Sequence, residues 1–308
     1  MKRDLVSLND VTAAEIEQLV AFSIELKQRH KGGIPAPLLA GKNLALLFNK
    51  PSLRTRASFE VGIQQLGGFT SYIQDSDVIM GVREPIKDLG RILSRYYDGI
   101  VIRTFAHTIV EELAHAASVP VINGLTDWEH PCQILAALQT LQERFGRLQG
   151  LHVAYVGDGN NVVHSWLIGA ALMGMTFTVA CPQGYRPDTT LLQQARRLAE
   201  TTGASLEVVD DPRQGVKGAD VVYTDVWISM GQEAEAAVRR EIFRPYQVNT
   251  ALLAEAPSHA IVMHCLPAHR GEEITDDVLE SDRSLVFEEA ENRLHVQKAL
   301  LVFLLQGL

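Results

Sequence analysis

Hydrophobic positions along the chain alternate between helical stretches and short apolar runs of the length of buried strands. In the first half, apolar runs predict strands at 43–48, 69–73, 99–102 and 119–122. Helical periodicity predicts helices at 12–30, 52–66, 86–97, 108–117 and 131–144. Alternating strands and helices indicate βα units and a parallel sheet, so this half is predicted to form one α/β domain.

The second half repeats the pattern. Strands are predicted at 151–156, 176–180, 205–209, 221–224, 260–264 and 284–287, with helices between them. A final helix is predicted over 289–305 and, on its length, is expected to return to the first domain. A chain of 308 residues also suggests two domains, since one domain typically takes roughly 150 residues. The predicted fold class is α/β, with two domains that each contain a parallel sheet flanked by helices, Rossmann-like, joined by long helices.

Charge narrows the range of partners. The chain has 28 basic and 37 acidic side chains, a net charge of −9, and lacks the basic surface expected of a nucleic-acid-binding protein. Residues 1–150 carry 16 of each sign, whereas residues 151–308 carry 12 basic and 21 acidic. The neutral half could hold an anion at a local arginine cluster, and the acidic half could favour a cationic small molecule. An ordinary solvated acidic surface explains the imbalance equally well.

Cysteine usage and hydropathy favour a cytoplasmic protein. The three cysteines are widely spaced and include no C-x-x-C pair, so neither a disulfide framework nor a zinc ribbon is expected. No apolar run reaches the roughly 18 residues of a membrane span, and the N-terminus has no signal-peptide core. We therefore expect no association with a membrane.

A candidate anion site follows the first predicted strand. The segment Ser52-Leu53-Arg54-Thr55-Arg56 combines two arginines, two hydroxyl groups and the N–H groups of a starting helix. Helix N-termini and arginine both bind phosphate-like oxyanions. Arg103, His130 and Gln133 follow later strands and could reach the same anion, because the carboxyl ends of parallel strands share one edge. Each also has a plain structural explanation, such as a helix cap or a satisfied backbone group.

Two cofactor classes are not expected. A metal site built from histidines and cysteines lacks the P-C-x-x-C and H-E-x-x-H patterns. The turn Gly157-Asp158-Gly159 resembles a dinucleotide fingerprint, but position 162 is valine, and no acidic residue ends the next strand. We therefore predict neither NAD nor any other cofactor.

The second half offers a candidate amino-acid site. An amide at Asn160 or Asn161 could donate to a carboxylate, although a local Asx turn is the alternative. Asp225 follows a predicted strand and could hold an ammonium group. The stretch 229–231 could offer N–H groups to a carboxylate and act as a lid. Together these features suggest an amino-acid substrate.

Four motifs resemble the signature set of the aspartate/ornithine carbamoyltransferase family, and within it the branch that uses ornithine. They are Ser52-Leu53-Arg54-Thr55-Arg56, His130-Pro131-Cys132-Gln133, Asp225-Val226-Trp227-Ile228-Ser229-Met230-Gly231 and His264-Cys265-Leu266-Pro267. The first two are shared across carbamoyltransferases, and the last two are typical of ornithine enzymes. Relatives that use aspartate typically have H-P-L-P as the last motif, whereas residue 265 of this chain is cysteine rather than proline.

The resemblance implies transfer of a carbamoyl group from carbamoyl phosphate to the δ-amine of L-ornithine, giving L-citrulline and phosphate, as in arginine biosynthesis. It implies a carbamoyl-phosphate-binding domain at 1–140, an ornithine-binding domain at 141–290 and a C-terminal helix at 291–308. It further implies a homotrimer, or a multiple of trimers, with active sites at subunit interfaces.

Matching positions carry over the family's site residues. Those implied to bind carbamoyl phosphate are Ser52, Leu53, Arg54, Thr55, Arg103, His130 and Gln133, with Arg293 closing the site. Those implied to bind ornithine are Asn161, Asp225, Ser229, Met230, Cys265 and Leu266. The implied catalytic residues are Arg103, His130, Asp225 and Cys265.

Three positions depart from the family pattern. Leu53 stands where threonine is common, Ala137 where aspartate is usual, and Ile79 where many relatives offer glutamine to a neighbouring subunit. Ala137 could remove a carboxylate that orients a catalytic group. Two alternatives stay open. One is transfer to another amine, such as N-acetylornithine or putrescine, because acceptor choice resides in a few loop residues. The other, suggested by Ala137 and Ile79, is a non-catalytic relative that retains the fold.

Overall fold

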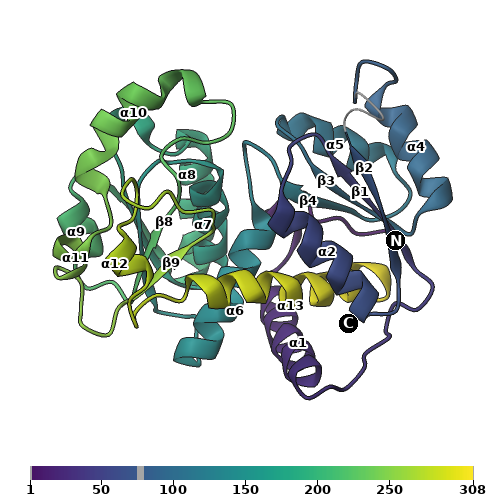
Figure 1. Ribbon diagram of the computed structural model, residues 1–308, viewed down its shortest axis with the longest axis horizontal. Helices are drawn as coiled ribbons and strands as arrows, with labels where there is room; N and C mark the ends of the chain where they lie inside the picture. Colours follow the sequence, from purple (N-terminus) through teal and green to yellow (C-terminus); the bar gives the residue numbers. More distant parts are fainter. Residues whose placement is uncertain (1, 75–79, 308) are drawn as a thin grey trace. The chain divides into compact units, whose positions relative to one another are not determined.

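The computed structural model describes residues 2–74 and 80–307, so position 79 lies outside the described residues (Figure 1). The chain divides into two compact units. Unit 1 consists of Met1–Gln139 and Glu291–Leu308, and unit 2 of Thr140–Ala290. Each unit contains one sheet and is described separately.

Unit 1 is built around a four-stranded parallel sheet. Its strands are β1 (Asn43–Phe48), β2 (Phe69–Gln74), β3 (Gly99–Arg103) and β4 (Val121–Leu125). Its helices are η1 (Leu8–Asp10), α1 (Ala13–Lys31), α2 (Leu53–Gln65), α4 (Ile86–Tyr96) and α5 (His107–Ala116). Two further helices cross the division between the units in sequence: α6 (Pro131–Phe145) and α13 (Val286–Leu305).

The order of strands in this sheet is β2-β1-β3-β4, so the chain reverses its direction of travel between β1 and β3. Helices α4 and α5 pack together on one face, over a core that includes Leu47 and Ile100. Gly90 permits this packing, because an added Cβ would lie 3.2 Å from the carbonyl oxygen of Leu113. In register, Phe48 at the end of β1 pairs with Arg103 at the end of β3, which places the following loops side by side.

Unit 2 contains a five-stranded parallel sheet. Its strands are β5 (His152–Val156), β6 (Thr176–Ala180), β7 (Ser205–Val209), β8 (Val221–Thr224) and β9 (Ile261–His264). Its α-helices are α7 (Asn161–Leu172), α8 (Thr189–Thr202), α9 (Pro212–Val216), α10 (Ala236–Phe243), α11 (Thr250–Leu253) and α12 (Asp276–Leu279). Three 3-10 helices complete it: η2 (Gln183–Tyr185), η3 (Glu233–Glu235) and η4 (Arg244–Tyr246).

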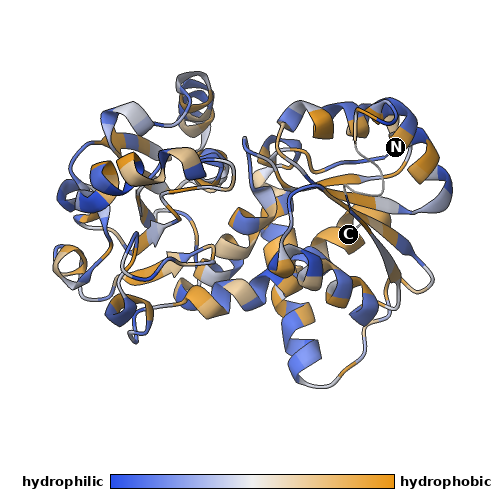
Figure 2. Ribbon diagram, turned by 45° about the horizontal axis from the view of Figure 1, so that its top comes forward, coloured by the Kyte–Doolittle hydropathy of each residue, from blue (hydrophilic) through white to orange (hydrophobic). Residues whose placement is uncertain are grey.

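The strand order in unit 2 is β7-β6-β5-β8-β9, so its reversal lies between β5 and β8. One face of the sheet packs through Val156, Val222 and Val262 against helices that include α10 and α11. The opposite face contains an aromatic cluster in which Trp166 of α7 stacks on Phe177 and meets the edge of Tyr223. Figure 2 shows hydrophobic colour concentrated on the strands and polar colour on the outer helix surfaces.

The predicted fold class is confirmed: each unit is a parallel sheet flanked by helices. The prediction of a strand at 284–287 is wrong, because the structure has no strand there. Ser284 forms only an isolated bridge with Val262, and α13 begins at Val286. The helix begins earlier than predicted because a short apolar run matches the interior of a helix as well as a strand. Among the described residues, no helix is long and apolar enough to cross a bilayer.

Candidate active site

The candidate anion site in unit 1 is at the reversal point of its sheet, where ligands of open parallel sheets commonly bind. After β1, Ser52 caps α2, and its Oγ accepts a hydrogen bond from the Thr55 N–H at 3.3 Å. The first turn of α2 therefore presents N–H groups at the sheet edge. The Leu53 side chain is 80% exposed, so only its backbone can serve this site.

Two buried guanidinium groups converge on the Thr55 hydroxyl. Arg293 donates to Thr55 Oγ1 from Nη2 at 3.1 Å and to Gln133 Oε1 from Nη1 at 2.7 Å. Arg103, at the end of β3, donates from Nη1 to the same hydroxyl at 3.5 Å and from Nε to the Lys50 carbonyl at 3.1 Å. Four side chains from four distant parts of the sequence are thus held in one group.

His130 lies in this positive environment. It is buried in the loop after β4, immediately before α6. Burial lowers the pKa of His130 well below its usual range, and the charges of Arg293, Arg103, Lys50 and Arg54 lower it further. The imidazole is therefore neutral at physiological pH and can donate one hydrogen bond without adding charge.

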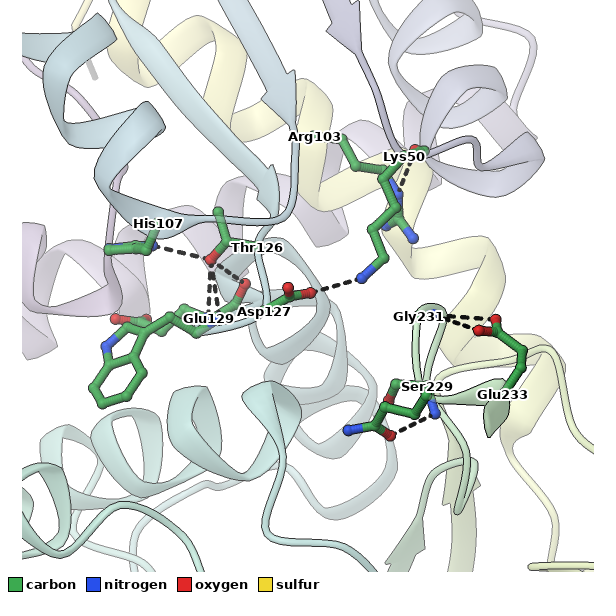
Figure 3. A network of polar contacts seen from close by, with 11 residues as sticks. Lys50, Arg103, His107, Thr126, Asp127, Glu129, Ser229, Gly231 and Glu233 are labelled. Atoms are coloured by element: carbon green, nitrogen blue, oxygen red, sulfur yellow. Dashed lines mark hydrogen bonds and ion pairs between the residues drawn. The ribbon is translucent and has the colours of Figure 1, made fainter. Parts of the chain in front are cut away.

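Lys50 adds a third buried cation to Arg103 and Arg293, and it was not among the predicted site residues. Its Nζ lies 2.7 Å from Asp127 Oδ1 (Figure 3). It also lies 4.9 Å from the centre of the Phe105 ring. In Figure 3, Lys50 lies between Arg103 and Asp127. Seventy-seven positions separate Lys50 from Asp127, so no local sequence signal joins them.

The loop that carries His130 is fixed by its own hydrogen bonds. Thr126 Oγ1 accepts from the N–H groups of Trp128 and Glu129 and lies 3.0 Å from His107 Nδ1 (Figure 3). The Glu129 carboxylate accepts the Leu8 N–H at 3.2 Å, which ties the loop to the N-terminal segment. His130 is therefore positioned by a rigid backbone.

Arg56 and Ala137 do not contribute side chains to the group around Thr55. Arg56 pairs with Glu60 at 2.9 Å and stacks on Tyr72, with 3.8 Å from its Cζ to the ring centre, so it is directed away from the Thr55 group. Ala137 is completely buried in α6, one helical turn after Gln133.

The acidic site in unit 2 is also at a sheet reversal. Asp225 follows β8 and is buried; its Oδ1 accepts from the Val226 N–H and from Cys265 Sγ, both at 2.8 Å. Its Oδ2 accepts from Asn160 Nδ2 at 2.7 Å. Asp225, Cys265 and Asn160 follow the adjacent strands β8, β9 and β5, and the sheet therefore brings them together. A buried carboxylate with a partly exposed thiol beside it can bind an ammonium or amine.

Close backbone contact shapes the turn after β5. A Cβ on Gly159 would lie 2.4 Å from the backbone nitrogen of Pro187, so only glycine fits there. Arg239 braces the same region: it pairs with Asp158 and donates from Nε to the Trp227 carbonyl at 2.6 Å. Burial raises the pKa of Asp158 to about 6, although Arg239 opposes this shift.

The loop from Ser229 to Gly231 is hydrogen-bonded to the side chains of the residues that directly follow it. The Ser229 N–H donates to Gln232 Oε1 at 3.0 Å, and the Gly231 N–H donates to both carboxylate oxygens of Glu233 at 3.0 Å (Figure 3). Met230 is exposed. Ligand binding by these N–H groups stays a prediction and requires exchange of these partners.

Three potential metal ligands in unit 2 are close together. Among the described residues, donor atoms of Asp225, His264 and Cys265 lie within 4.8 Å of one another. However, His264 Nδ1 accepts the Leu266 N–H at 2.8 Å, and His264 Nε2 lies 3.0 Å from Glu273. A metal ion bound to His264 would have to break one of these contacts. The two contacts therefore favour a structural role for His264 over metal binding. The hydrogen bond to Leu266 helps to hold that residue at a φ of 55° beside Cys265.

Comparison with known families accounts for both units. Residues 3–143 match the family described as aspartate/ornithine carbamoyltransferase, carbamoyl-P binding domain, and residues 149–304 match its Asp/Orn binding domain. The chain belongs to the aspartate/ornithine carbamoyltransferase family, and the resemblance of its motifs is confirmed.

Individual relatives extend over nearly the whole chain. The ornithine carbamoyltransferase of Carboxydothermus hydrogenoformans is 55% identical over 303 residues, which cover 98% of this chain and 97% of that protein. The ornithine carbamoyltransferase of Thermococcus kodakarensis is 53% identical over 306 residues, which cover 99% and 97%. Among solved structures, the ornithine carbamoyltransferase of Pyrococcus furiosus superposes with a TM-score of 0.97 at 50% identity and covers 100% of this chain and 98% of that chain.

Proposed function

We propose that the chain transfers the carbamoyl group of carbamoyl phosphate to the δ-amine of L-ornithine and forms L-citrulline and phosphate. The observation that carries this proposal is the convergence of Arg103 and Arg293 on Thr55 beside a neutral His130. Two guanidinium groups at one sheet edge favour a doubly charged anion, and planar guanidinium groups match the oxygens of a phosphate ester. The family and its named relatives support the same reaction.

Each side chain of unit 1 has a distinct task in this proposal. The N–H groups at the start of α2, including that of Leu53, bind the phosphate together with Ser52, Arg54 and Thr55. Arg103 and His130 donate to the carbonyl oxygen, and Gln133 binds the carbamoyl end. Arg293 completes the site, since its guanidinium already touches both Thr55 and Gln133.

In unit 2, ornithine is held at the carboxyl ends of β5, β8 and β9. Asp225 binds and orients an ammonium group of ornithine, while Asn161 and the loop at Ser229 and Met230 bind its α-carboxylate. Cys265 and Leu266 lie beside the reacting δ-amine. The close contact between Cys265 Sγ and Asp225 Oδ1 supports a shared role for these two residues.

The reaction begins when the δ-ammonium loses a proton to solvent, because only the neutral amine has a lone pair. That nitrogen attacks the carbonyl carbon, the new C–N bond forms, and the C–O bond to phosphate breaks with its electron pair leaving on the phosphate. The second proton that the nitrogen releases passes to the departing phosphate or to solvent. Negative charge grows on the carbonyl oxygen and then on the leaving phosphate. Arg103 and His130 stabilise the charge on the carbonyl oxygen. Arg54 and the N–H groups of α2 stabilise the charge on the phosphate. Both are cases of preorganised electrostatic catalysis.

We also propose that the chain forms a homotrimer, or a multiple of trimers. Unit 1 exposes large apolar side chains at Leu53, Phe69, Val82 and Tyr96, with exposed fractions of 80%, 61%, 81% and 69%. Phe69 is on β2, an edge strand of its sheet, where a neighbouring subunit could cover it. Sedimentation of the purified chain at several concentrations tests this proposal.

A cytoplasmic location is proposed on the chemistry of the cysteines. Cys132, Cys181 and Cys265 are thiols that form no disulfide, and the first two are buried. Burial raises the pKa of Cys132 and of Cys181 to about 12, so both are unreactive neutral thiols in the folded chain. Free thiols are typical of a reducing compartment. Cell fractionation tests this location.

The decisive assay is citrulline formation from carbamoyl phosphate and L-ornithine, with N-acetylornithine, putrescine and aspartate tested in parallel. Turnover with ornithine alone supports the proposal. Turnover only with another amine would retain the phosphate site but reject the ornithine site. Absence of turnover with every acceptor would reject catalysis and leave a binding protein with the family fold.

A further inference from the structure

Asn160 makes hydrogen bonds in two directions from one amide. Its Oδ1 accepts the N–H groups of Val162 and Val163, at 3.0 and 3.3 Å, and thereby caps α7. Its Nδ2 donates to Asp225 Oδ2 at 2.7 Å. The same side chain therefore joins the end of β5 to the residue after β8, on either side of the sheet reversal.

Only an amide can perform both tasks at this position. Aspartate or serine would cap α7 equally well, because an N-cap needs only an acceptor oxygen. Neither ionised aspartate nor the shorter serine can reach Asp225 as a donor. The identity of residue 160 is therefore set by the carboxylate that faces it, as well as by the helix that it starts.

The contact fixes one oxygen of Asp225 while Cys265 and the Val226 N–H fix the other. Without the amide, the carboxylate retains bonds to Oδ1 alone and can rotate about its Cβ–Cγ bond. Rotation would change the direction in which the charge faces an incoming ammonium. Asn160 thus controls the orientation of the acidic group, without itself needing to touch a substrate.

We propose that Asn160 is a positioning residue that acts through Asp225 to set the affinity for the acceptor amine. This inference rests on the proposed function, which makes Asp225 a ligand of ornithine. The neighbouring Asn161 remains the proposed substrate-binding amide.

The test compares Asn160→Ser with a matched variant, Asn249→Ser. Asn249 is also an N-cap: its Oδ1 accepts the Leu252 N–H at 3.0 Å, and its Nδ2 donates to Gln247 Oε1 at 3.2 Å. Both substitutions retain a capping oxygen and remove an amide donor in the same unit. Only Asn160 faces the Asp225 carboxylate.

Steady-state kinetics and thermal unfolding give the first readout. We expect Asn160→Ser to raise the KM for ornithine about tenfold, because a hydrogen bond to a charged group is lost. The KM for carbamoyl phosphate should stay within about twofold of wild type, and Tm should match that of Asn249→Ser. An unchanged ornithine KM would overturn the inference, as would an equal rise in both KM values together with a lower Tm.

A second readout needs no substrate, so it remains decisive if the proposed reaction itself fails. Cys265 is the partly exposed thiol of the chain and donates to Asp225. If Asp225 can rotate more freely, iodoacetamide should alkylate Cys265 faster. Mass spectrometry measures this rate. A severalfold increase in Asn160→Ser and none in Asn249→Ser supports positioning of Asp225, and equal rates in all three proteins overturn it. A wild-type chain that forms no citrulline would reject the proposed function alone.

Asn160→Asp provides a second variant if the serine variant folds poorly. It retains the cap and places one carboxylate opposite another, which displaces Asp225 by charge repulsion. We expect the same rise in the alkylation rate of Cys265. A rate equal to that of wild type would count against the inference.

Discussion

Arg293 donates a hydrogen bond from Nη2 to the hydroxyl of Thr55 at 3.1 Å, although 238 positions separate the two residues. The contact brings the C-terminal helix α13 to the first turn of α2 in unit 1. It places a second guanidinium beside Arg103, and the two charges face one acceptor oxygen. Two guanidinium groups at one point raise the local positive potential and favour an anion there, which is the physical basis of the predicted phosphate site.

Arg293→Gln should weaken carbamoyl-phosphate binding by about 10- to 100-fold, since a charge-assisted hydrogen bond contributes roughly 1.5–3 kcal/mol. The affinity can be measured by isothermal titration in the absence of ornithine. The matched control is Arg29→Gln, which removes an arginine of α1 whose side chain is 36% exposed. Equal losses in the two variants would show that only net charge matters.

Asp127→Asn should strengthen binding of the product phosphate. The Asp127 carboxylate lies 2.7 Å from Lys50 and neutralises part of its charge. Removing one negative charge close to an anion site should strengthen anion binding by about 0.5–2 kcal/mol, depending on the local dielectric. The inhibition constant of phosphate should fall about two- to tenfold, and the effect should shrink with added salt. A higher inhibition constant would contradict this view of Lys50.

The fold was predictable because the apolar runs have the length and spacing of buried strands. Runs at 43–48, 176–180, 205–209 and 221–224 coincide with β1, β6, β7 and β8. The run at 284–287 failed because Val286 and Phe287 belong to the first turn of α13 and Leu285 directly precedes it. Periodicity over four residues cannot separate these two cases.

Candidate site residues were predictable to the extent that they follow strand ends. A parallel sheet gathers those positions at one edge, as it does for Thr55 with Arg103 and for Asp225 with Cys265. The pairing of Lys50 with Asp127, and the donation from Asn160 to Asp225, depend on the rotamers of residues 77 and 65 positions apart. No local pattern specifies which of two neighbouring amides turns toward which carboxylate.

Cys265→Ala should lower turnover more than it lowers affinity for carbamoyl phosphate. The thiol donates to Asp225 Oδ1, so its loss frees one oxygen of the carboxylate that orients the amine. We expect kcat to fall at least tenfold and the KM for carbamoyl phosphate to stay within about twofold. Cys265→Ser retains a donor to Asp225 and should recover part of kcat. Full activity in the alanine variant would remove Cys265 from the mechanism.

His130 should make the folded chain less stable as the pH falls. Its folded pKa lies well below the ordinary value, near 6.5, that it regains on unfolding. Below about pH 6.5 the unfolded state therefore binds a proton that the folded state does not bind. The free energy of unfolding should decrease by up to about 1.4 kcal/mol per pH unit from this group.

Urea unfolding of wild type and His130→Asn between pH 7.5 and 5 isolates this contribution. Other histidines shift in the same direction, and burial lowers the pKa of His295 to about 4, so only the difference between the two proteins reports on His130. Above about pH 7 the difference should be constant. Parallel pH profiles throughout would show that His130 titrates normally in the folded chain.

Tyr223→Phe should destabilise unit 2 by about 1–3 kcal/mol, because it removes a hydrogen bond to a buried carboxylate. The Tyr223 hydroxyl donates to Glu289 Oε1 at 2.7 Å, and both residues are fully buried. The bond joins β8, which precedes Asp225, to the first turns of α13, one turn before Arg293. Chemical denaturation at fixed protein concentration measures the loss, and Tyr96→Phe provides an exposed control with the same atom removed. A shift no larger than that of the control would mean that Glu289 is satisfied without Tyr223.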